Sequence, residues 1–230
     1  GDVYDDACAH AYELAEEHGY TFIHPFDDPA VATGQGTIAM EIIKELPLVD
    51  YILVPIGGGG LATGVSTLAK LLNPNIKVIG VEPAGANCLQ VSLDKGEVTT
   101  LPTVNTIADG TAVKTPGEHV FPYLQKNLDD VITVEDDELI VSFLDMVENH
   151  KMIVENSGLL TVAALKHLNV KGKKVVSVLS GSARFTRMPY GAKNGRPSCH
   201  ATPTSQPALR TSSMVFPCVL HHSSQSRNSI

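Results

Sequence analysis

The stretch best suited to bind a ligand is a run of consecutive glycines, Gly57, Gly58, Gly59 and Gly60, followed by Leu61. A short apolar run, 51–54, precedes it and is typical of a strand buried on both faces of a parallel sheet. Apolar residues then recur along one helical face, at Val65, Leu68 and Leu72. Each glycine loses roughly 0.5–1 kcal/mol more backbone freedom than alanine on folding, so close approach of bare backbone to a ligand is the favoured explanation.

A glycine turn that opens a helix presents several backbone N–H groups, and the helix dipole favours negative charge there. A phosphate is therefore the expected ligand, and a tight turn without a ligand is the alternative. The glycines are contiguous, and no Gly-Lys-Ser/Thr follows them, so neither common nucleotide signature is present. We expect the phosphate of a group other than ATP or NAD.

Several motifs, in this order, resemble the pyridoxal-phosphate enzymes of the threonine dehydratase and serine racemase family, which have the tryptophan synthase β fold. They are His24–Pro29, Gly34–Thr37, Pro47–Asp50 with Val54–Leu61, Val81–Pro83, Thr106–Gly110 and Leu179–Gly181. The resemblance implies pyridoxal 5'-phosphate as cofactor and a small amino acid as substrate. It also implies homo-oligomers in the full-length form.

The favoured activity is that of an L-threonine/L-serine ammonia-lyase (dehydratase), which gives a 2-oxo acid and ammonia and belongs to amino-acid metabolism and isoleucine biosynthesis. A serine racemase fragment is the near alternative. From a different class, the chain could be a non-catalytic subunit that binds phosphate or pyridoxal phosphate.

The resemblance also assigns residues. It implies that Gly57, Gly58, Gly59, Gly60 and Leu61 hold the cofactor phosphate through their N–H groups, and that Ser180 faces the pyridine nitrogen. Taken alone, Ser180 is better explained as a capping or turn serine.

A cation site is implied at Glu82 and the Ala86 carbonyl. Cys88 stands where the family has an acidic side chain, and a thiol suits a hard divalent or monovalent cation poorly. We therefore expect a weakened or absent site, with Glu82 as an ordinary strand-end carboxylate as the alternative. Asp109 matches a family aspartate near the domain cleft, and it is assigned no proton-transfer role.

The family's Schiff-base lysine motif, Ser-Phe-Lys-x-Arg-Gly-Ala, does not occur in these residues, nor does its substrate-carboxylate loop. Both belong to the family's amino-terminal part. We therefore assign no catalytic residue, since Lys44, Lys70 and Lys114 offer no convincing substitute. The chain reads as the carboxyl-terminal portion of such an enzyme, inactive alone.

Composition indicates a soluble globular protein, with 43% hydrophobic and 18% charged residues among 230. No apolar run is long enough for a membrane span, and no signal peptide opens the chain. The start at Gly1 suggests a processed or cut end. Four widely scattered cysteines favour reduced thiols and a cytoplasmic location.

Three segments are expected: 1–19, the end of a small domain or a linking helix; 20–183, an incomplete large cofactor-binding domain; and 184–230, a disordered or out-of-frame tail. All 25 acidic residues lie at or before Glu155. The tail's scattered charges give little support for nucleic-acid binding. A zinc site there, from Cys199, His200, Cys218, His221 and His222, is disfavoured by the surrounding composition.

The patterns predict an α/β fold: a three-layer parallel sheet with helices on both faces, as in an incomplete fold type II large domain. The predicted strands are 20–24, 51–54, 76–81, 131–134 and 175–179. The predicted helices are 4–18, 37–46, a helix that runs on from Leu61, a helix that includes 139–147, and a last helix at 157–168. Residues 85–120 are expected as loops and short helices. Ligands bind beyond the carboxyl ends of such strands, where the glycine run and Ser180 both fall. The missing part would leave an exposed sheet edge, so poor solubility or oligomers are expected.

Overall fold

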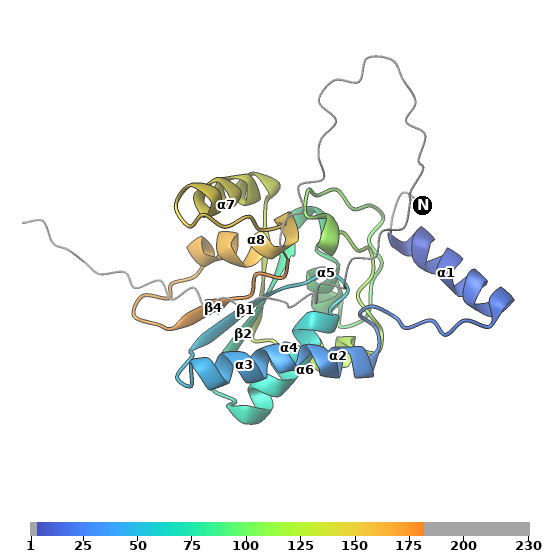
Figure 1. The fold of residues 1–230 in the computed structure, drawn as a ribbon, viewed down its shortest axis with the longest axis horizontal. Coiled ribbons are helices and arrows are strands. Elements are labelled where there is room, and N and C mark those ends of the chain that lie inside the picture. Colours follow the sequence, from blue (N-terminus) through green and yellow to red (C-terminus); the bar gives the residue numbers. More distant parts are fainter. Residues whose placement is uncertain (1–3, 182–230) are drawn as a thin grey trace, which may run out of the picture.

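The computed structural model describes residues 4–181. Its centre is a sheet of four parallel strands in the order β3-β2-β1-β4 (Figure 1). Their bounds are β1 (Tyr51–Pro55), β2 (Lys77–Pro83), β3 (Asp130–Val134) and β4 (Val175–Ser177). In the register of the sheet, Leu53 of β1 lies between Ile79 and Ser177. The parallel sheet predicted from the alternation of strands and helices is therefore confirmed.

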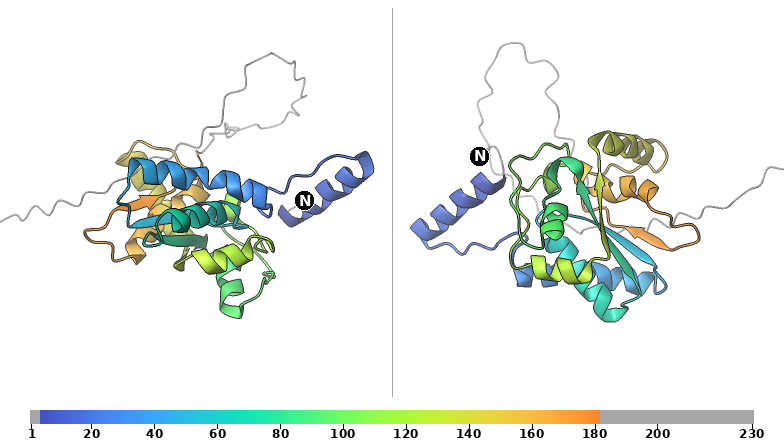
Figure 2. Two further views of the ribbon diagram at one scale, coloured as in Figure 1. Left: turned by 90° about the horizontal axis from the view of Figure 1, so that it is seen from below. Right: turned by 180° about the vertical axis from the view of Figure 1, so that it is seen from behind.

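Helices cover both faces of this sheet, which makes three layers (Figures 1 and 2). On one face lie α2 (Pro29–Gln35), α3 (Thr37–Glu45), α4 (Gly60–Leu72) and α6 (Phe121–Asn127). On the other lie α7 (Asp136–Glu148) and α8 (Asn156–Ala163). The remaining short elements are α5 (Cys88–Lys95) and three turns of 3₁₀ helix, at Ala84–Ala86, Asp109–Thr111 and Ala164–His167.

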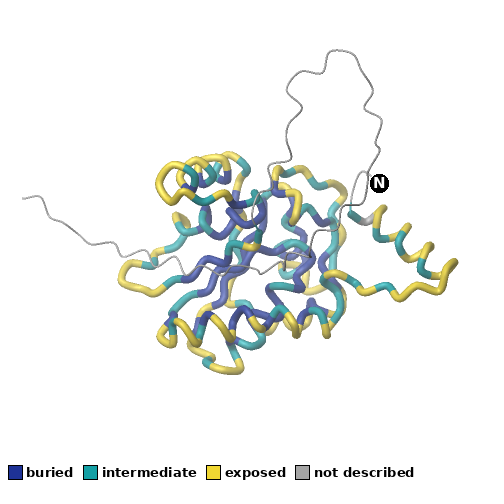
Figure 3. The backbone as a smooth tube through the Cα atoms, in the orientation of Figure 1, coloured by how far each residue is buried: buried dark blue, intermediate teal, exposed yellow. Residues whose placement is uncertain are grey.

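Strand β1 is buried because successive side chains point to opposite faces and both faces are covered. Ile52 and Val54 pack in the cluster that contains residues of α3 and α4, whereas Leu53 packs with residues of α7 and α8. All three residues are fully buried. Figure 3 colours the strands at the centre of the molecule as buried. Burial of each such side chain stabilises the fold by about 1.5–3 kcal/mol.

The predicted strand at 20–24 is wrong, since this segment pairs with no strand of the described sheet. Tyr20 and Ile23 are 67% and 66% exposed, so the apolar residues that suggested a strand do not face the core. The predicted helix 157–168 also ends earlier than expected, because α8 changes to a 3₁₀ turn at Ala164. Residues 85–120 form loops and short helices, as predicted.

Helix α1 (Tyr4–His18) confirms the helix expected there, and it lies beside the layers and not within them (Figure 2). It contacts the body through Tyr4, whose ring centroid lies 5.4 Å from that of Phe26, and through Cys8, whose Sγ lies 3.9 Å from His24 Nε2. No helix of the described chain is long and apolar enough to cross a membrane. The predicted tail and its candidate zinc ligands lie outside the described residues.

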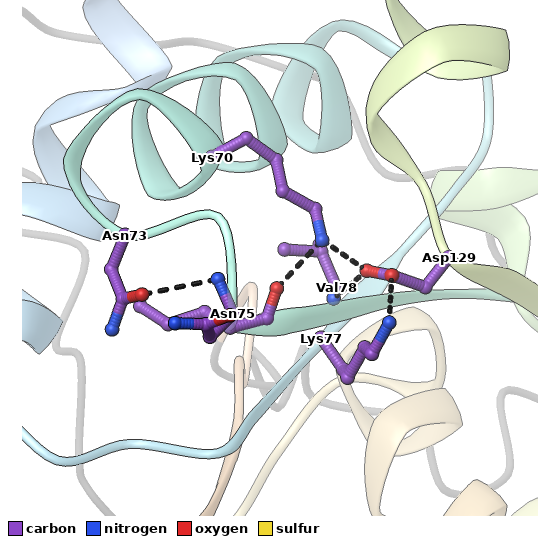
Figure 4. Close-up of polar contacts among 7 residues, drawn as sticks. Lys70, Asn73, Asn75, Lys77, Val78 and Asp129 are labelled. Atoms are coloured by element: carbon purple, nitrogen blue, oxygen red, sulfur yellow. Dashed lines mark hydrogen bonds and ion pairs between the residues drawn. The ribbon is translucent and has the colours of Figure 1, made fainter.

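A polar clamp at Asp129 fixes the amino ends of β2 and β3 (Figure 4). Its carboxylate accepts hydrogen bonds from Lys70 Nζ at 2.6 Å, Lys77 Nζ at 2.8 Å and the Val78 N–H at 2.8 Å. Lys70 also donates to the Ile76 carbonyl at 2.7 Å. The clamp therefore joins the end of α4 to the start of the sheet, opposite the end where the glycine run lies.

Candidate functional site

The glycine loop, residues Gly57–Gly60, joins the carboxyl end of β1 to the start of α4. Ile56 extends the pairing by donating its N–H to the Val81 carbonyl at 2.8 Å. Gly59 then adopts a left-handed φ of 100°, which favours glycine, and its carbonyl accepts the N–H of Thr63 at 2.9 Å. The strand–turn–helix arrangement predicted from the sequence is confirmed.

The N–H groups from Gly57 to Leu61 donate to no acceptor among residues 4–181. Those of Gly60 and Leu61 are at the helix start, where no intrahelical acceptor exists. Gly58, Gly59 and Gly60 are buried, and buried N–H groups without a partner are rare in proteins. Together with the positive end of α4, these donors form an arrangement that suits an anionic group.

Packing gives the glycines a second role. A Cβ on Gly58 would overlap the Phe26 ring, one on Gly59 would lie 2.6 Å from Leu124 Cδ1, and one on Gly60 would lie 2.7 Å from the Phe26 carbonyl oxygen. The interpretation from sequence, which attributed the glycines to ligand approach, was therefore incomplete. Phe26 and Leu124 fill the space that side chains at Gly58, Gly59 and Gly60 would need, while the N–H groups of the loop remain unpaired.

Other loops meet the glycine loop at the same end of the sheet. A Cβ on Gly57 would lie 3.0 Å from Thr111 Cα, and Thr111 Oγ1 is 3.4 Å from Ser157 Oγ at the start of α8. A Cβ on Gly158 would in turn lie 3.2 Å from the Ser180 nitrogen. The structure thus links the glycine loop to the neighbourhood of Ser180 by way of Thr111 and the start of α8.

Ser180 follows β4, and it is exposed. Its hydroxyl has no hydrogen-bond partner in the described part of the chain, and it caps no helix there. Within residues 4–181 the Ser180 side chain therefore acts as no helix cap, and its assignment to the ring nitrogen stays a prediction. Asp109, by contrast, is exposed and accepts the N–H of Gly110 at 3.0 Å.

Glu155 is a site residue that the sequence analysis missed. It immediately precedes α8, its N–H donates to the Gly181 carbonyl at 3.2 Å, and its carboxyl group lies against the Cα of Gly181. Burial raises the pKa of Glu155, and the nearby charge of Asp109 raises it further. The only signal in the sequence is an acidic residue directly before a helical pattern.

The predicted cation ligands occupy the next loop, after β2. Glu82 is fully buried, and its carboxylate accepts the N–H groups of Leu89 and Gln90, both at 2.8 Å. Burial raises the pKa of Glu82 to about 7, although these two hydrogen bonds oppose the shift. Cys88 Sγ lies 3.8 Å from Glu82 Oε1, and burial raises the pKa of the thiol. Ala86 is buried beside them.

The three lysines considered as substitutes occupy different surroundings. Lys70 is held by Asp129 at the opposite end of the strands (Figure 4). Lys44 is exposed in the last turn of α3. Lys114 lies in the loop after the 3₁₀ turn at 109–111, and its carbonyl accepts the Leu101 N–H at 2.9 Å. None of these positions suggests a group held ready for covalent chemistry.

A cavity of about 350 Å³ lies beside the glycine loop, between α1 and residues 115–118. Phe26 and Gly117, which both contact the loop, form part of its wall. No glycine of the loop lines it, so this cavity is a neighbour of the candidate site and not the site itself.

The fold and the loop together define an α/β protein whose candidate ligand site lies beyond the carboxyl ends of parallel strands. A family model described as "Pyridoxal-phosphate dependent enzyme" matches residues 1–181. The chain belongs to this family.

Curated relatives agree with the match. The chain is 44% identical over 183 residues to L-threonine ammonia-lyase of Geobacter sulfurreducens, covering 79% of this chain and 46% of the relative. It is also 44% identical over 186 residues to a biosynthetic L-threonine dehydratase of Haemophilus influenzae, covering 79% of this chain and 36% of the relative. The chain therefore spans less than half the length of these relatives.

Solved structures share the fold. The processed form of threonine deaminase isoform 2 from Solanum lycopersicum superposes with a TM-score of 0.74 at 38% identity, covering 77% of this chain and 53% of that one. Serine racemase from Dictyostelium discoideum superposes with a TM-score of 0.69 at 40% identity, covering 76% and 57%. The predicted resemblance and the fold type II class are confirmed.

Proposed function

We propose that the chain is the cofactor-binding part of a pyridoxal-phosphate-dependent L-threonine/L-serine ammonia-lyase, which gives a 2-oxo acid and ammonia. The observation that carries the proposal is the row of unpaired N–H groups from Gly57 to Leu61 at the start of α4. The names of both curated relatives support L-threonine as a substrate, and the word biosynthetic in the name of the Haemophilus influenzae relative fits the proposed place in isoleucine biosynthesis.

In this proposal each site residue has a defined role. The N–H groups of Gly57, Gly58, Gly59, Gly60 and Leu61 bind the phosphate, and the Ser180 hydroxyl is the partner of the ring nitrogen. Pyridoxal phosphate, when bound, supplies an electron sink for bond cleavage at the α-carbon of an amino acid. Because Ser180 is neutral, it stabilises a protonated ring less than a carboxylate would, which suits elimination of a β-substituent.

The 230-residue chain is proposed to be inactive alone, because it lacks the family's Schiff-base lysine motif. The full-length form would supply that lysine and the substrate-carboxylate loop, and it would be cytoplasmic and homo-oligomeric. The isolated chain is expected to bind the cofactor through its phosphate and ring only.

Equilibrium dialysis with pyridoxal phosphate tests the binding role. We expect saturable binding that inorganic phosphate displaces, no single lysine adduct after borohydride reduction, and no turnover of L-threonine. Ser180→Ala should weaken binding of pyridoxal phosphate severalfold and leave the affinity for inorganic phosphate unchanged. Absence of saturable binding, or equal loss for both ligands, would contradict the assigned roles.

Serine racemase is retained as the second candidate because of the 40% identity to the Dictyostelium discoideum enzyme. The two activities are separated in the full-length protein by assaying 2-oxo acid release from L-threonine against D-serine formation from L-serine. A third outcome, neither activity in a full-length form that still binds pyridoxal phosphate, would favour the non-catalytic subunit.

A further inference from the structure

Glu82 and Cys88 form a buried polar pair directly behind the glycine loop, and both residues are fully buried. Glu82 Oε1 accepts the N–H of Leu89 and Oε2 accepts that of Gln90, each at 2.8 Å. Cys88 Sγ lies 3.8 Å from Glu82 Oε1 and 3.8 Å from the Gly57 carbonyl oxygen. The pair therefore connects β2, the start of α5 and the glycine loop.

This arrangement does not fit the cation that the family resemblance implies. Ca²⁺ takes six to eight oxygen ligands and Mg²⁺ requires a near-octahedral set. Here both carboxylate oxygens of Glu82 already accept backbone N–H groups, and the second side-chain position of the implied site holds the sulfur of Cys88. Residues 4–181 contain no group of three or more His, Cys, Asp or Glu side chains placed to hold a metal ion.

The groups present can satisfy one another without an ion. The first N–H groups of α5 supply partial positive charge to the Glu82 carboxylate, as the start of a helix does for an anion. The thiol has one proton, which it can donate to Glu82 Oε1 or to the Gly57 carbonyl oxygen. Buried polar atoms at this position are therefore paired within the protein.

We infer that Glu82 and Cys88 replace the family's cation site with a link made of protein groups alone, which holds the glycine loop against β2 and α5. The folded chain should accordingly show no specific dependence on Mg²⁺, Ca²⁺, K⁺ or Na⁺. This inference concerns the stability of the loop, and it does not depend on whether the chain binds pyridoxal phosphate.

The test is the melting temperature of the purified chain in each chloride salt, at constant ionic strength set with tetramethylammonium chloride. After treatment with EDTA, the wild-type chain should melt within about 1 °C in all four salts. Cys88→Ser, which keeps a single hydrogen-bond donor, should behave in the same way. A saturable rise of several degrees with one cation in the wild-type chain, reversed by its removal, would overturn the inference.

Cys88→Asp is the matched variant, because it places a second carboxylate beside Glu82. Two buried like charges repel, and a cation bound between them stabilises the folded state by mass action. We expect this variant to melt lower than the wild type without divalent ions and to recover by roughly 5 °C in millimolar Mg²⁺ or Ca²⁺. If Cys88→Asp fails to fold in every salt, the melting temperatures of the wild type and of Cys88→Ser still decide whether a cation stabilises the chain.

Discussion

The Asp27 carboxylate contacts both the backbone N–H and the imidazole ring of His119. Asp27 Oδ1 accepts the His119 N–H at 2.8 Å, and Asp27 Oδ2 lies 2.9 Å from His119 Nδ1. Asp27 directly follows Phe26, whose ring lies against Gly58, and the N–H of Gly117 donates to the Gly58 carbonyl at 2.9 Å. The ion pair therefore joins two segments that are 92 residues apart in sequence and that both contact the glycine loop.

Replacing His119 with asparagine should reduce stability in a pH-dependent way. The hydrogen bond to Asp27 and its charge raise the pKa of His119, so the stabilisation is complete below the unfolded pKa of about 6.5 and is lost as the pH rises through the folded value. Burial would raise the pKa of Asp27, but hydrogen bonds from His119 and Val120 outweigh it and the net shift is downward. The stabilisation that ionised Asp27 gives the folded state is fully present above the unfolded pKa of about 3.9, and it is lost as the pH falls through the lower folded value.

The measurement for this pair is the urea midpoint of the wild type and of His119→Asn from pH 3 to 9. The difference should be largest near pH 5–6 and should shrink toward both ends of the range. His18→Asn, at an exposed position in α1, is the control. A difference that does not vary with pH would show that the His119 ring acts only by packing.

Gly58→Ala should destabilise the chain by about 1–3 kcal/mol, because the added methyl group would overlap the Phe26 ring. Gly34→Ala is the matched control: its Cβ would meet no atom within 4 Å, and α2 should gain about 0.5–1 kcal/mol. Urea unfolding of both variants measures the contrast. Adding Phe26→Leu should restore part of the stability that Gly58→Ala loses. If Phe26→Leu changed the stability of Gly34→Ala by the same amount, the assigned contact between Phe26 and Gly58 would be refuted.

Local patterns were sufficient to predict the sheet and the glycine turn. The apolar run of β1 and the helical spacing after Leu61 are each contained in a short stretch of sequence. Each can therefore be recognised without knowledge of distant residues. The segment 20–24 failed for a related reason. An apolar pattern shows that a strand can form, but it does not show whether a sheet edge is within reach.

The surroundings of the site could not be predicted from local patterns. Asp27 and His119 are 92 residues apart, and nothing near either residue specifies the other. Similarly, the contact between Phe26 and Gly58 depends on how α2 packs against α4. The raised pKa of Glu155 depends on burial and on Asp109, which only the folded chain brings close.

Asp129→Ala should reduce stability by about 1–3 kcal/mol without changing ligand affinity. The carboxylate accepts three hydrogen bonds (Figure 4), and its loss leaves the Val78 N–H and the Lys70 ammonium with unmet hydrogen bonds. Lys77→Ala should cost far less than Asp129→Ala, since that side chain is 52% exposed and its ion pair is screened by solvent. Urea unfolding and dialysis with pyridoxal phosphate separate the two effects, and weaker binding by folded Asp129→Ala would contradict the placement of the site at the opposite strand ends.

Glu155→Gln should stabilise the chain above neutral pH. Burial and the Asp109 charge raise the pKa of Glu155, so its ionised form is less favourable in the folded state than in the unfolded state. This penalty is fully present above the folded pKa and disappears as the pH falls below the unfolded value of about 4.3. We expect a gain of less than about 1 kcal/mol at pH 8 and none at pH 4, because the group is only partly buried.

A series of urea midpoints for Glu155→Gln between pH 4 and 8 tests this, with Glu148→Gln at the exposed end of α7 as the control. Asp109→Asn should reproduce a smaller part of the gain by removing only the second cause. A destabilised Glu155→Gln at pH 8 would mean that the carboxylate makes a favourable contact there. The predicted gain would instead identify Glu155 as a residue whose charge is retained at a cost in stability, as is usual beside a functional site.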